Sequence, residues 1–127
     1  MPQDIPIITL ASDKGPPTIE IIFGHAHLGT YRFFLWDGQN PELKKHGNNI
    51  DNVVDSFTLS EPLASLHQRI LSYELIIQAA ESGPGQIFSY TVTVRQRGAI
   101  CEGGVIAKSG PFEQFHQDVE FRRFNVV

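Results

Sequence analysis

Apolar and polar residues alternate with a period of two along much of the chain, a pattern typical of β-strands. It is clearest over residues 88–95, where Phe, Tyr, Val and Val alternate with Ser, Thr, Thr and Arg. Residues 72–79 are apolar on both faces, and the Gly-Pro-Gly of residues 83–85 is strong turn punctuation. We therefore predict a long β-hairpin over residues 71–97, which forms the central strand pair of the fold.

The same alternation predicts further short strands with turns between them. We expect these strands at residues 6–10, 18–23, 30–36, 53–59, 99–101, 105–108 and 118–127. Gly103 and Gly104 predict a tight hairpin between two of them. Residues 39–52 are rich in Asn, Gly, Pro and charge, so we interpret them as a long surface loop.

The last predicted strand has an alternation that slips. Val119 and Phe121 lie on one face, whereas Phe124 and Val126 lie on the other. One extra residue near Arg122 would bring all four apolar side chains to one face, so we predict a β-bulge there.

Residues 61–80 fit two structures. Their apolar residues recur at intervals of 3, 4, 3 and 4, which forms a helical stripe behind a plausible N-cap at Ser60. We favour a strand over residues 70–79, because few good helix formers face outward and a turn follows. A helix over residues 61–80 is the alternative, and it would make the fold α+β.

Short strands at regular spacing indicate the fold class. We predict a single all-β domain over residues 1–127, an antiparallel β-sandwich of about seven to nine strands. The length is sufficient for a core without disulfides. Only Cys101 is present, so neither a disulfide framework nor a Cys-based zinc site is expected.

Charge and composition indicate which classes of binding partner and which cellular locations fit this chain. The net charge is −4 and the pI is near 5.6, which disfavours nucleic-acid binding. The first ten residues lack the basic region of a signal peptide, and the apolar runs are too short to span a membrane. These features are compatible with a soluble, cytoplasmic protein.

His25-Ala26-His27 is the sharpest candidate for chemistry. On a strand, the two imidazoles would point to one face and could chelate a divalent metal, the one cofactor we consider. The tripeptide resembles the first half of the cupin motif, a His-x-His on a strand, and this resemblance implies a metal-dependent enzyme. The chain departs from that motif, since no Glu or Asp follows before Asp37 and His116 lies in a different context. The simpler interpretation is two half-exposed side chains at a strand end.

A second group of residues could bind a ligand. Trp36 ends a predicted strand, where an exposed aromatic ring could stack on a sugar. Asn48, Asn49 and Asp51 belong to an oxygen-rich stretch whose atoms suit Ca²⁺, although the spacing is not that of an EF-hand. Turn formation explains these Asn and Asp residues equally well.

Three functions remain open. We favour a non-catalytic binding or structural module that contacts a protein partner or its own copy, because no nucleophile elbow or phosphate-binding loop is present. The alternatives are a carbohydrate- or small-ligand-binding domain that uses Trp36, and a cupin-like enzyme that uses His25 and His27.

Overall fold

The computed structural model describes residues 4–25, 27–50, 54–81 and 83–127. In these residues the chain forms one short helical turn and nine strands. The elements are β1 (Ile7–Leu10), β2 (Thr18–Phe23), β3 (Leu28–Asp37), β4 (Asn40–Asn48), β5 (Asp55–Thr58), the 3₁₀ helix η1 (Leu63–Leu66), β6 (Ile70–Gln78), β7 (Gln86–Gln96), β8 (Ala99–Phe112) and β9 (Phe115–Val126).

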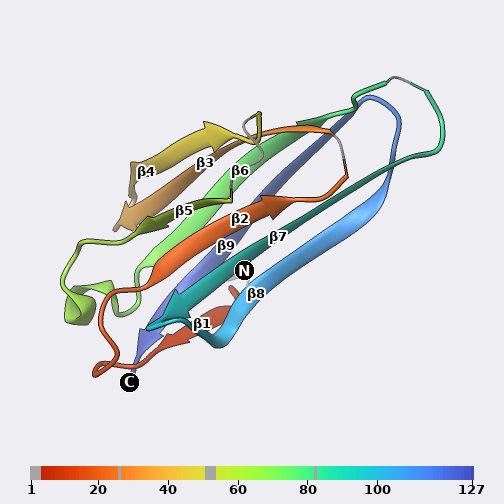
Figure 1. Cartoon of the computed structure of the whole chain (residues 1–127). Coiled ribbons are helices and arrows are strands. Elements are labelled where there is room, and N and C mark those ends of the chain that lie inside the picture. Colours follow the sequence, from red (N-terminus) through yellow and green to blue (C-terminus); the bar gives the residue numbers. More distant parts are fainter. Residues whose placement is uncertain (1–3, 26, 51–53, 82) are drawn as a thin grey trace.

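The strands form one mixed sheet that curls into a nearly closed barrel (Figure 1). The strand order is β4-β3-β6-β9-β1-β8-β7-β2-β5. The prediction of a single all-β domain is confirmed. The prediction of an antiparallel sandwich is wrong, because β1 runs parallel to β9 and links the two halves of the sheet.

β1 contacts β8 where β8 bulges away from β7. β7 and β8 pair regularly up to Thr93↔Val105, and pairing resumes with a shifted register at Arg95↔Ile100. The intervening part of β8 turns toward β1 and forms the bridge Thr9↔Glu102. The predicted hairpin at residues 103–104 is therefore wrong. The two glycines bend one continuous strand, as glycines at β-bulges often do.

β6 and β7 do not form the predicted hairpin. β6 pairs with β3 and β9, whereas β7 pairs with β8 and β2. The two strands face each other across the interior, where the hydroxyl oxygens of Tyr73 and Tyr90 lie 3.0 Å apart. The segment that joins them is thus an arch between two walls. Each strand has an apolar face toward the core, so the alternation pattern is the same for an arch and for a hairpin.

Two other segments differ from the expected structure. The alternative helix over residues 61–80 is wrong, since only Leu63–Leu66 is helical and β6 follows. The loop predicted at residues 39–52 is wrong as well, because β4 pairs with β3 along its length. β4 is an edge strand with almost no buried side chains, so it shows no apolar alternation.

In the first half of β9, the usual arrangement is reversed: apolar side chains face outward and charged side chains face the interior. Its register with β6 runs without a break from Ile70↔Arg123 to Gln78↔Phe115, so the predicted bulge is wrong. Phe124 faces the core and is fully buried. Because side chains alternate, Val119 and Phe121 face outward and charged residues between them face inward. This inversion gives the barrel a polar interior wall and an apolar exterior patch along one strand.

Candidate functional site

The inner face of β9 carries a row of ionisable side chains. Asp118, Glu120 and Arg122 point into the barrel at a level where β8 and β9 have separated. A cavity of about 390 Å³ opens here, above β1. It is lined by Asp4, Ile5, Pro6, Lys108, Val119, Glu120, Phe121 and Arg122. We call the opening between β8 (residues 105–112) and β9 (residues 115–122) the slot.

Two cations share one carboxylate in the slot. Arg122 Nη1 lies 3.0 Å from Glu120 Oε1, and Lys108 Nζ lies 3.6 Å from Glu120 Oε2. Lys108 comes from β8, so this ion pair crosses the opening between the two strands. The three side chains together carry one excess positive charge. Their partial exposure keeps the stabilisation from the pairs small.

A hydrogen-bonded chain lies deeper in the barrel. Tyr90 donates to Asp118 Oδ2 at 2.5 Å, so Tyr73 donates to the Tyr90 hydroxyl oxygen. Burial raises the pKa of both tyrosines, and for Tyr90 the hydrogen bond to Asp118 raises it further. Both phenols therefore remain donors near neutral pH and hold the Asp118 carboxylate in place.

The outer face of β3, β6 and β9, with Leu43 from β4, presents an apolar surface, which we call the outer patch. It consists of Phe34, Trp36, Leu43, Val119 and Phe121. Leu43, Val119 and Phe121 are 51%, 45% and 42% exposed. The register places Leu43 opposite Phe34, and Phe34 and Phe121 lie on either side of Ser72. A hollow of about 190 Å³ lies among these side chains.

The predicted ligand Trp36 belongs to this patch. Its ring is half-buried, and its Nε1–H donates to Ser72 Oγ at 2.8 Å. Asn48 lies at the far end of the β3–β4 hairpin, opposite Thr30. At the rise of a β-strand this separates Trp36 and Asn48 by about 20 Å. The structure thus does not bring the predicted ligand residues together at one site.

The other predicted ligand residues form local contacts. Asn48 Oδ1 accepts from the Ile50 N–H, a turn contact. Asn49 Oδ1 accepts from the Gly29 N–H at 2.9 Å, and its Nδ2 donates to the His27 carbonyl at 2.8 Å. Asn49 therefore fixes the start of β3. Asp51 lies outside the described residues.

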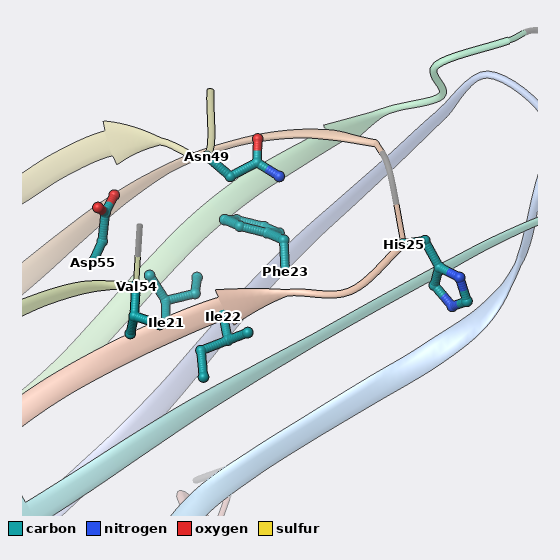
Figure 2. A pocket seen from close by; sticks show the side chains of 7 residues that line it. All are labelled: Ile21, Ile22, Phe23, His25, Asn49, Val54 and Asp55. Atoms are coloured by element: carbon teal, nitrogen blue, oxygen red, sulfur yellow. The ribbon is translucent and has the colours of Figure 1, made fainter. Parts of the chain in front are cut away.

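His25 and Asn49 line a pocket of about 100 Å³ at the seam between β2, β5 and β4 (Figure 2). Figure 2 shows the His25 imidazole at one end and the Asp55 carboxylate at the other, with Phe23 between them. Asp55 Oδ2 accepts a 2.6 Å hydrogen bond from the Tyr31 hydroxyl. The pocket thus keeps the imidazole of His25 apart from the Asp55 carboxylate (Figure 2).

Both ring nitrogens of His27 are engaged by the backbone. The Ala80 N–H donates to Nδ1 at 3.1 Å, so Nε2 carries the proton and donates to the Ile87 carbonyl at 2.9 Å. The ring also packs edge-on against Phe112 at 4.9 Å. His27 thus ties the β2–β3 connection to both ends of the arch. The ring centroids of His25 and His27 are 6.1 Å apart, and the metal role of this pair stays a prediction.

His27→Phe is expected to lower the free energy of unfolding by about 2 kcal/mol. The substitution keeps an aromatic ring against Phe112 but removes two hydrogen bonds that are each worth about 1 kcal/mol. Urea unfolding measures the change. The matched control is His25→Asn, because Asn tolerates the positive φ of 60° at this exposed position. Equal losses of unfolding free energy in both variants would show that the backbone hydrogen bonds of His27 do not stabilise the fold.

Within residues 4–25, 27–50, 54–81 and 83–127, no group of three His, Cys, Asp or Glu side chains is arranged to hold a metal ion. In the same residues, no helix has the length and apolar character needed to cross a membrane. No protein-family model, curated protein or solved structure matches this chain.

Sequence reasoning missed the slot and the outer patch. The slip in alternation between Phe121 and Phe124 is the available signal, and on its own it fits the expected bulge as well as an inversion. A continuous register makes the same slip an inversion, with apolar side chains outside and charged side chains inside. Local patterns that conflict with the global fold concentrate at functional sites.

Proposed function

We propose that the chain is a non-catalytic binding module that associates with a second copy of itself through the outer patch. The proposal rests on the exposure of Leu43, Val119 and Phe121 on one sheet face. Contiguous exposed apolar surface is typical of protein interaction sites. Aromatic side chains near the centre of such a surface usually supply most of the binding energy.

The charge around the patch favours a second copy as the partner. Arg32 forms an ion pair with Glu74 beside the patch, and its guanidinium lies 5.7 Å from the Phe34 ring centroid. This charge pair is already neutralised within one molecule. A two-fold symmetric contact brings identical surfaces together, so the area around the axis, where each residue meets its own copy, should carry no unpaired charge. The outer patch meets this requirement.

The sheet edges favour face-to-face packing over strand pairing between copies. β4 carries Pro41, Lys44 and Lys45, and its register with β3 shifts between Phe33 and Phe34. β5, at the other end of the strand order, has only four residues. Prolines, lysines, bulges and short strands are the features with which proteins block edge pairing. The exposed face is therefore the better surface for association.

Phe121→Ser is expected to shift the chain from dimer to monomer and to weaken association by at least about tenfold. Phe121 lies in the patch and has no role in the core, so the variant should fold normally. Sedimentation equilibrium over a concentration series measures the dissociation constant.

The matched control for this experiment is Ile100→Ser. Ile100 is 53% exposed, but it lies on β8, away from the patch. It should leave the dissociation constant unchanged. A wild-type chain that stays monomeric up to its solubility limit would refute the proposal, as would equal weakening by both variants.

A further inference from the structure

The outer patch has a midline that runs along the strands, between β3 and β6. The four strands under the patch lie in the order β4-β3-β6-β9, so two strands lie on each side of this line (Figure 1). Leu43 and Phe34 lie on one side of it, and Val119 and Phe121 lie on the other. The midline therefore divides the apolar side chains into two groups that could cover each other in a pair of copies.

A row of polar and charged residues crosses the same midline. Arg32 on β3 is the register partner of Glu74 on β6, and the two side chains form an ion pair in which they are 59% and 36% exposed. His46 on β4 and Val119 on β9 complete the row. The face thus carries a positive group on one side of the midline and a negative group on the other, and solvent reaches both.

The symmetry of a contact between two copies determines which residues meet. In a face-to-face contact, the two-fold axis lies in the plane of the interface. Each residue then meets the residue that lies equally far on the other side of the axis. With the axis along the midline, β3 of one copy lies over β6 of the second copy. Arg32 meets Glu74 of the second copy, and Leu43 meets Phe121.

An axis across the strands gives a poorer contact. If it followed the row that contains Ser72, each strand would lie over its own copy. Arg32 would then meet Trp36, and Glu74 would meet Ile70. The ion pair would lose water without gaining a new partner, which is unfavourable for buried charges. The axis along the midline instead gives each charge a second opposite charge.

We propose that the dimer has its two-fold axis along the midline, and that Arg32 and Glu74 exchange ion pairs between the copies and so select the partner. This inference rests on the proposed function, because it assigns the arrangement of the same interface. The contact contains two positive and two negative groups in alternation, which is complementary to itself. The strands of the two sheets also run in line, as they do in aligned sheet-on-sheet packing.

The double variant Arg32→Glu/Glu74→Arg tests this proposal. It reverses the ion pair but keeps it within each molecule, so the variant should fold as the wild type does. Two variant copies again bring opposite charges together, and their dissociation constant should stay within about threefold of the wild-type value. A wild-type copy and a variant copy would instead bring like charges together twice. Mixed dimers should therefore be at least about tenfold weaker than either pure dimer.

Native mass spectrometry of an equimolar mixture measures the fraction of mixed dimers. Isotope labelling of the wild-type chain separates the species, because the double reversal leaves the composition unchanged. The matched control is Glu20→Arg/Arg95→Glu, which reverses a 3.0 Å ion pair between β2 and β7, outside the patch. This control should form mixed dimers with the wild type as often as chance predicts. Circular dichroism checks the fold of both variants.

The outcomes separate this inference from the proposed self-association. Mixed dimers of the Arg32→Glu/Glu74→Arg variant at the frequency of chance would overturn the inference, as would loss of self-association in this variant. The wild-type dimer and its disruption by Phe121→Ser would then still support the proposed function. A wild-type chain that stays monomeric would refute both proposals.

Discussion

Gly103→Ala is expected to lower the free energy of unfolding by about 3 kcal/mol. Gly103 has a φ of +74°, where an L side chain is strained. A Cβ at this position would also lie 2.2 Å from the Ile7 carbonyl oxygen. This contact is with backbone, so β1 must move away from β8. Urea unfolding measures the loss, and hydrogen exchange should show faster exchange at the amides of β1.

Gly98→Ala is the matched control for Gly103→Ala. Gly98 has a similar φ of +80°, but a Cβ there would meet nothing within 4 Å. It should cost only about 1 kcal/mol, the penalty of the backbone conformation alone. Equal losses of unfolding free energy at the two positions would show that β1 does not pack closely against the bulge of β8.

Gln96→Leu is expected to lower the free energy of unfolding by a similar amount, about 3 kcal/mol. The Gln96 side chain is buried at the end of β7 and binds the β1–β2 connection. Its Oε1 accepts from the Ala11 N–H at 2.9 Å, and its Nε2 donates to the carbonyls of Ala11 and Gly15 at 3.0 and 2.8 Å. Leucine has a similar size but leaves these backbone groups unpaired. Thermal and urea unfolding measure the change.

Two further variants serve as comparisons for the stability loss expected in Gln96→Leu. Gln78→Leu, at an exposed position on β6, should change stability by less than about 0.5 kcal/mol. Gln96→Glu keeps the acceptor for Ala11 but places a buried carboxylate oxygen against the carbonyls of Ala11 and Gly15, so its loss should be at least as large as that of Gln96→Leu. If Gln96→Leu is as stable as Gln78→Leu, water must replace the three hydrogen bonds.

These two positions show how the nearly closed barrel depends on β1. Gly103 allows β1 to approach β8, and Gln96 fixes the chain that leaves β1. β1 has only four residues, yet it joins the two halves of the sheet. Loss of either contact should therefore affect the stability of the whole fold more than the size of β1 suggests.

The contacts that the candidate residues make could not be predicted from the sequence. His27 is fixed by two backbone groups that lie 53 and 60 residues away along the chain, and no local pattern contains such partners. Asn49 likewise binds the start of β3. Lys108 and Glu120 form an ion pair across the opening between β8 and β9, and strand spacing in the sequence does not show that these two side chains face each other. None of these contacts follows from spacing in the sequence.

The sequence by itself determined that the chain is a single all-β domain, and it located strands such as β2, β3, β6 and β7 through their alternation. The tertiary structure alone decided that β6 and β7 form an arch, that Gly103 and Gly104 bend one strand, and that β9 turns Val119 and Phe121 outward. The physical reason is that a period of two distinguishes the two faces of a strand. It does not specify which strand lies alongside, or which face the rest of the chain covers.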